Sequence, residues 1–171
     1  MNGTVKTILR SAGTLTLIAA IATAALAGTN ALTADRIARN NEEVATETRR
    51  TVIEADAFEP QTLPESGETY YTALQNGAVV GYVFTVTTSG KSSGLTVMTG
   101  ISTAGEITGV AVTADNETAG YVDKVTKGGL LDALRGHTAT DGVDTVSQAT
   151  KTSKGVLRGV QQALDYYKQI G

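Results

Sequence analysis

The chain begins with a long apolar stretch. Twenty-four residues between Arg10 and Asp35 carry no charge, and the most apolar part runs from Leu15 to Ala27. Because about 20 apolar residues span a bilayer as a helix, this stretch predicts an N-terminal transmembrane anchor. A secretory signal peptide is the alternative interpretation, since Ala25-Leu26-Ala27 has the form of a cleavage site. The hydrophobic pattern alone leaves both interpretations open.

The charges on either side of the apolar stretch bear on its orientation. Lys6 and Arg10 precede it, and by the positive-inside rule they favour a cytoplasmic N-terminus. Arg36 and Arg39 follow it and weaken that preference. We predict that the N-terminus is cytoplasmic and that the rest of the chain lies outside the cytoplasm.

A segment dense in charge follows, from Ala34 to Ala57. Ile37, Val44 and Val52 fall roughly on one helical face and form only a thin apolar stripe. We therefore expect a helix that continues from the anchor, ends before Pro60 and exposes its charges to solvent. Residues 58–67 contain both prolines of the chain and predict a linker.

From residue 70 onward the pattern becomes that of β-strands. Four segments have strand-like composition, and they cover residues 70–75, 78–87, 95–101 and 107–113. The first two flank Asn76-Gly77, a dipeptide typical of β-hairpin turns, and the last two flank a turn that contains Gly105. The two hairpins predict a four-stranded antiparallel sheet.

Helices are expected again toward the C-terminus. Residues 115–121 predict a loop, and residues 128–134 predict a short helix. Apolar side chains recur at helical spacing in residues 154–170, and polar ones occupy the rest of the wheel, which indicates an amphipathic helix. The sequence therefore predicts an α+β fold: an N-terminal transmembrane helix, then a small domain with an antiparallel sheet and flanking helices.

The amino-acid composition excludes several kinds of metal site, catalytic group and binding partner. At 171 residues, the chain has room for one domain and a short appendage. It contains no cysteine, which excludes Cys-ligated iron–sulfur clusters, zinc-thiolate sites, disulfides and a cysteine nucleophile. The single histidine, His137, argues against a histidine-based metal site or catalytic triad. The net charge of −3, without an evident basic patch, argues against nucleic acid as a partner.

The segment from Asp144 to Ser153, DTVSQATKTS, is rich in hydroxyl side chains. By itself it predicts the cap and approach loop of the last helix, because Ser and Thr are common N-cap residues. A helix N-terminus also presents unpaired N–H groups and a partial positive charge, so the same place can bind an anion.

This segment resembles the flavinylation motif D-x-x-S-G-A-T-x-[ST]-S, which belongs to the FMN-binding domains of the Rnf G subunit and of the C subunit of the sodium-pumping NADH:quinone reductase. The matching positions are Asp144, Ser147, Ala149, Thr150, Thr152 and Ser153. Gln148 stands in place of the usual Gly, and it carries a conformational cost if that Gly takes a positive φ.

Two further stretches carry the same resemblance. Residues 94–112 look like the family's G-x-I-x-x-x-x-G-I-x-x-x-G-x-I-x-G-V-x-V run, and residues 117–120, Glu-Thr-Ala-Gly, look like its E-T-P-G-L-G loop with Ala119 for Pro. The likeness covers roughly residues 5–170. The shortness of the chain favours the Rnf G subunit over its longer relative.

The resemblance implies which residues bind the cofactor. FMN would be attached to Thr150 through a phosphoester bond made by a separate flavin transferase. The other motif positions, Asp144, Ser147, Ala149, Thr152 and Ser153, become FMN-binding candidates. The second loop adds candidate flavin contacts at Glu117, Thr118, Ala119, Gly120 and Tyr121. The resemblance implies no catalytic group and no metal ligand in this chain.

The resemblance also implies a function and a location. The chain would be an electron-transfer subunit of a membrane-bound, ion-translocating complex that links ferredoxin oxidation to the reduction of NAD⁺ or another acceptor. Its partners would be other membrane subunits of that complex. The family favours a retained anchor with the FMN domain on the extracytoplasmic side. We predict an N-terminal tip and anchor in residues 1–34, a connector in residues 35–67 and the FMN-binding domain in residues 68–171.

Three alternatives stay open at this point. A membrane-anchored ligand-binding or sensory module without covalent flavin would make Thr150 dispensable. A structural subunit whose motif has decayed at Gln148 would be colourless after expression with a flavin transferase. A flavin reductase acting on a small oxidant would turn over as the soluble domain alone.

Overall fold

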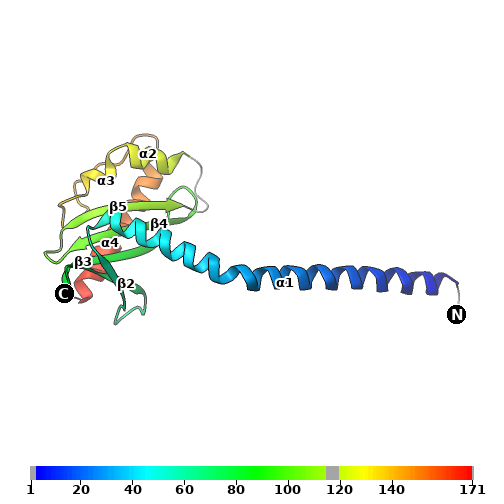
Figure 1. Cartoon of the computed structure of the whole chain (residues 1–171). Helices are drawn as coiled ribbons and strands as arrows, with labels where there is room; N and C mark the ends of the chain where they lie inside the picture. The colour runs from blue at the N-terminus through cyan, green and yellow to red at the C-terminus, as the bar shows by residue number, and fades with distance from the viewer. Residues whose placement is uncertain (1–2, 115–119, 171) are drawn as a thin grey trace. The chain divides into compact units, whose positions relative to one another are not determined.

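The computed structural model describes residues 3–114 and 120–170. Its contacts divide the chain into two units, one up to Val44 and one from Ala45 onward. Helix α1, Gly3–Val52, contributes to both units (Figure 1). The second unit holds every strand and the three other helices.

The first unit is a single exposed helix. Large apolar side chains on it, such as Leu15, Ile21 and Leu32, are exposed. Within the described residues, α1 is the one helix long and apolar enough to cross a membrane, a criterion that an N-terminal signal sequence also meets. The hydroxyls of its threonines donate to carbonyls four residues back, as seen at Thr14, Thr23, Thr29 and Thr33. Such back-bonding satisfies a polar side chain that has no water to bind.

The second unit is built on one five-stranded antiparallel sheet with the strand order β1-β2-β3-β4-β5 (Figure 1). The strands are β1 Ala57–Thr62, β2 Thr69–Gln75, β3 Ala78–Ser89, β4 Ser93–Ser102 and β5 Ile107–Ala114. Both predicted hairpins are present, β2 with β3 and β4 with β5. Asn76 and Gly77 have φ angles of 50° and 79°, as a type I′ hairpin turn requires. The predicted α+β class is confirmed.

Strand β1 was not expected. Most of it lies in the stretch that the prolines marked as a linker, and that interpretation is wrong for residues 58–62. Pro60 pairs with Tyr71 of β2, and β1 lies at the edge of the sheet. Proline is tolerated in edge strands because only one side of the strand must donate hydrogen bonds.

Each face of the sheet buries a different partner, because alternate residues of a strand point to opposite faces. One face carries Phe84 and Val97, and helix α4 covers it. The opposite face carries Val83 and Met98, which cluster with Val52 from the end of α1. The last turn of α1 is therefore part of the folded domain.

The helices after the sheet differ from their predicted bounds. The predicted helix at residues 128–134 is two short ones, α2 Tyr121–Lys127 and α3 Leu130–Ala133. They are separated by Gly128 and by Gly129, whose φ of 78° is in the left-handed region. Most of the predicted loop at residues 115–121 lies outside the described residues. Helix α4, Thr150–Ile170, begins four residues earlier than the pattern indicated.

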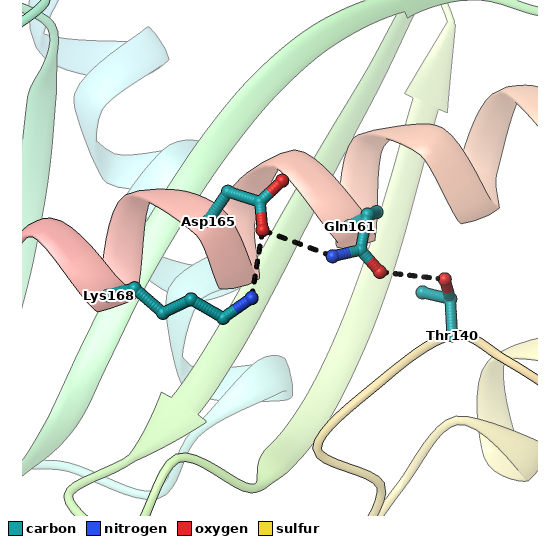
Figure 2. Close-up of polar contacts among 4 residues, drawn as sticks. All are labelled: Thr140, Gln161, Asp165 and Lys168. Atoms are coloured by element: carbon teal, nitrogen blue, oxygen red, sulfur yellow. Dashed lines mark hydrogen bonds and ion pairs between the residues drawn. The ribbon is translucent and has the colours of Figure 1, made fainter.

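A polar chain ties the segment before α4 to the helix itself. Figure 2 shows Thr140 donating to Gln161 Oε1 at 3.0 Å. The Gln161 amide donates to Asp165 at 3.1 Å, and Asp165 also pairs with Lys168 at 3.1 Å. This chain restrains the connection that leads into the first turn of α4.

Candidate functional site

A buried serine in the first turn of α4 connects the helix to the loop before it through two hydrogen bonds. Ser153 is fully buried, and its Oγ accepts a hydrogen bond from the Val146 N–H at 3.1 Å. The same hydroxyl donates to the Ala149 carbonyl at 3.0 Å. This side chain reaches back from the first turn to a preceding N–H, as in a capping box. Ser153 therefore fastens the approach loop to the helix.

The residue that departs from the family motif has an unusual backbone. Gln148 has a φ of 63°, in the left-handed region that glycine enters without steric cost. The turn buries Ala149, which is 2% exposed, and leaves Thr150 exposed as the first residue of α4. The conformational cost expected for a glutamine at this position is therefore present.

A pocket of about 290 Å³ lies at this helix N-terminus. Its described lining residues are Lys91, Tyr121, Gln148, Ala149, Thr150, Lys151 and Thr152. They come from the β3–β4 turn, the start of α2, the two residues before α4 and the first turn of α4. The volume is close to the lower end of the range of about 300–1,000 Å³ for small-molecule sites.

Positive charge gathers around this pocket. Lys91 Nζ donates to the Tyr121 hydroxyl at 3.0 Å and lies 4.4 Å from the centre of its ring. Lys124 Nζ lies 5.6 Å from the same ring and donates to Gln148 Oε1 at 3.2 Å. Lys151 lines the pocket beside Thr150. Three ammonium groups and the positive end of a 21-residue helix favour an anion here.

The structure brings together only some of the predicted site residues. Tyr121, Ala149, Thr150 and Thr152 line the pocket, although the Thr152 side chain is fully buried. Ser147 is exposed but is not among the lining residues, and Gly120 caps α2.

Asp144 lines a different hollow of about 400 Å³, next to α3, together with His137. The remaining candidates, Glu117, Thr118 and Ala119, lie outside the described residues.

The three lysines were missed by sequence reasoning. Lys91 is in a turn and Lys124 is on a short helix, both far from Thr150 in the chain. No local pattern distinguishes them from ordinary surface lysines. Lys151 occupies a variable position of the motif, where its charge next to Thr150 was the only available signal.

Comparison with known proteins defines the class of this site. Residues 90–165, which include the pocket and α4 as far as Asp165, match the family model described as FMN-binding domain. Residues 1–51 match the model described as RnfG N-terminal region.

A curated relative then identifies the family. Over 195 aligned residues the chain is 32% identical to the G subunit of the Na(+)-translocating ferredoxin:NAD(+) oxidoreductase complex of Acetobacterium woodii. The alignment covers 96% of this chain and 94% of that protein. The chain therefore belongs to the family of Rnf complex G subunits, and the resemblance described above is confirmed.

The described residues suit the phosphate end of FMN. Phosphate needs cationic and N–H donors, which the lysines and the first turn of α4 supply. The Tyr121 ring offers a flat apolar surface at the same pocket. Thr150 is an exposed residue and lines the same pocket.

Proposed function

We propose that this chain is the flavin-carrying electron-transfer subunit of a membrane-bound, ion-translocating Rnf-type complex. Its relative is named as part of a ferredoxin:NAD(+) oxidoreductase complex, and the chain contains a matched FMN-binding domain. FMN is attached to Thr150 Oγ1 by a phosphoester bond. The chain acts as an electron carrier within the complex and is not a stand-alone enzyme.

The burial of the hydroxyl side chains carries the assignment of Thr150. Five hydroxyl residues stand between Asp144 and Lys154, namely Thr145, Ser147, Thr150, Thr152 and Ser153. Thr152 and Ser153 are fully buried, and Thr145 and Ser147 are not among the pocket residues. Thr150 alone of these five is both exposed and part of the pocket lining. It is therefore the hydroxyl that a transferase and a phosphate can reach together.

We infer that the attachment step uses an outside catalyst. The described lining residues include no carboxylate and no imidazole that could take the Thr150 proton at neutral pH. With a flavin dinucleotide as donor, Thr150 Oγ1 bonds to the flavin-bearing phosphorus and the phosphoanhydride bond breaks. Adenosine monophosphate leaves, and the hydroxyl proton goes to a base of the transferase. A flavin transferase is therefore a maturation partner.

The same residues hold the cofactor once it is attached. The lysines and the α4 N-terminus would balance the charge of the phosphodiester, and the Tyr121 side chain would be available in the pocket lining to contact the flavin. FMN supplies reversible electron transfer, so this chain needs no acid–base machinery of its own.

Helix α1 anchors the subunit beside other membrane subunits. We place the FMN domain on the extracytoplasmic side, from the charges of Lys6 and Arg10.

The test is flavin fluorescence of the denatured full-length chain on a gel after co-expression with a flavin transferase. We expect a fluorescent wild-type band that disappears in Thr150→Val and persists in Thr150→Ser, which keeps the hydroxyl. Thr145→Val is the matched control, because it changes a nearby threonine outside this pocket, and it should stay fluorescent.

A dark wild-type band would refute covalent attachment and favour a ligand-binding module or a structural subunit without covalent flavin. Fluorescence that survives Thr150→Val would move the attachment to another residue. Assembly with other membrane subunits is tested separately, by co-purification of the full chain from membranes of its own host.

A further inference from the structure

The turn before Thr150 is held in a conformation that its residue does not favour. Among the described residues other than glycine, only Asn76 and Gln148 have positive φ angles. Asn76 belongs to an Asn-Gly hairpin turn, where short amide side chains are well tolerated. Gln148 has a longer side chain and no such local compensation. Its conformation must be held by a contact elsewhere in the fold.

Such a contact comes from helix α2. Lys124 Nζ donates to Gln148 Oε1 at 3.2 Å, across 24 residues of sequence. The Lys124 backbone is itself bonded at both ends, through its N–H to Gly120 and through its carbonyl to Gly128. The ammonium group thus extends from a fixed helix to the residue whose φ is strained.

We propose that Lys124 and Gln148 form a positioning pair that holds the left-handed turn and thereby presents Thr150 to its pocket. The proposal rests on the proposed function, since it concerns the residue that receives FMN. A glycine at position 148 would adopt the positive φ angle without steric cost, whereas in this chain the hydrogen bond between Lys124 and Gln148 stabilises that conformation. Lys124 then acts through Gln148 and needs no direct contact with FMN.

A purely electrostatic role for Lys124 is the competing explanation, because an ammonium group near the pocket also attracts phosphate. The two explanations differ in their dependence on position 148. A positioning role disappears when residue 148 is glycine, whereas attraction of phosphate does not.

The experiment compares the wild type, Lys124→Met, Gln148→Gly and the double variant as full-length chains in detergent. The initial rate of FMN incorporation is measured with purified flavin transferase and flavin adenine dinucleotide. We expect Lys124→Met to slow incorporation about threefold, as for loss of one exposed charged hydrogen bond. Gln148→Gly should be faster than wild type, and the double variant should match Gln148→Gly. Lys124→Arg, which keeps the donor, should restore most of the rate.

The result that overturns the proposal is equal slowing by Lys124→Met in both backgrounds, which would assign Lys124 to phosphate attraction alone. No slowing in either background overturns it as well. Amide hydrogen exchange of flavin-free protein gives an independent reading at Ala149 and Ser153, whose N–H groups bond within the turn. Lys124→Met should raise the exchange rate of these two amides in the chain that has Gln148, and should leave it unchanged in the Gln148→Gly background.

Failure of the proposed function gives a different result. A wild-type chain that takes up no flavin, or a Thr150→Ala chain that takes it up normally, would refute attachment at Thr150. The exchange measurement would still decide whether Lys124 and Gln148 hold the turn.

Discussion

The last turn of helix α1 packs closely on the sheet, and this contact allows a quantitative test of the fold. Gly100 and Gly109, neighbours on β4 and β5, lie under the last turn of α1. A Cβ at Gly100 would be 2.5 Å from the Val52 carbonyl oxygen and 2.5 Å from Thr108 Oγ1. Those two atoms already share a hydrogen bond of 2.6 Å. We predict that Gly100→Ala displaces the end of α1.

The expected cost follows from what that turn buries. Val52 is 2% exposed and Ile53 is 6% exposed. Complete loss of both side chains from the core would cost about 3–6 kcal/mol, at about 1.5–3 kcal/mol each. Overpacking alone costs about 1–3 kcal/mol when the surroundings yield. Because the obstacle includes backbone that moves only with the helix, we expect a loss near 3 kcal/mol, at the top of the overpacking range.

Two variants with smaller expected costs serve as comparisons for this value. Thr108→Val removes the hydrogen bond to Val52 without adding a backbone clash, and should cost about 1 kcal/mol. Gly28→Ala is the matched control, because a Cβ there meets nothing within 4 Å, and it should leave the second unit unchanged. Denaturant unfolding of the full chains in detergent measures these differences.

Trypsin reports the displacement locally. Arg49 is 4% exposed, and its guanidinium lies 3.5 Å from the centre of the Tyr71 ring. Release of the turn should accelerate cleavage after Arg49 in Gly100→Ala and not in Gly28→Ala, as measured by fragment mass. If the free energies of unfolding of Gly100→Ala and Gly28→Ala differ by less than about 0.5 kcal/mol, as for neutral surface changes, then close packing of α1 on Gly100 does not stabilise the fold as predicted.

Three further changes test the supports of the site. Ser153→Ala removes both hydrogen bonds of the Ser153 hydroxyl at the start of α4 and should lower the free energy of unfolding by about 1–2 kcal/mol. It should also slow FMN incorporation, and an unchanged incorporation rate would show that Ser153 does not hold the loop before α4 in place. Gly159→Ala places a Cβ 2.8 Å from Val97 and should lower the thermal midpoint, although alanine favours helix. Thr140→Val should raise amide exchange in residues 138–143 by removing the bond to Gln161, at a cost below about 1 kcal/mol.

Local signals explain why part of the fold could be predicted. The Asn76-Gly77 turn specifies its hairpin through its own backbone preferences, and the structure has that hairpin. The apolar stretch and the amphipathic periodicity of α4 also act within one element. Strand β1 could not be predicted in this way, because it exists only through pairing with β2, and its Pro60 gave the opposite local signal.

The start of α4 shows a similar limit of local reasoning. The apolar periodicity indicated a helix from Lys154, but the helix begins at Thr150. The earlier start is stabilised by Ser153, whose hydroxyl accepts a hydrogen bond from the Val146 N–H and donates one to the Ala149 carbonyl. A sequence pattern shows that a serine is present, whereas its burial in the first turn depends on the sheet beneath α4.

The family motif around Thr150, the apolar N-terminal helix and most of the secondary structure can be recognised in the sequence. Each of these depends on residues that are close together in the chain. Which hydroxyl of the motif is exposed, and which lysines lie near it, depends on how the chain packs. Lys91 and Thr150 line one pocket although they come from a turn and from helix α4, and Lys124 of α2 reaches Gln148 in the lining of that pocket. Long-range packing therefore distinguishes the residue that we propose carries FMN from its neighbours that hold the helix in place.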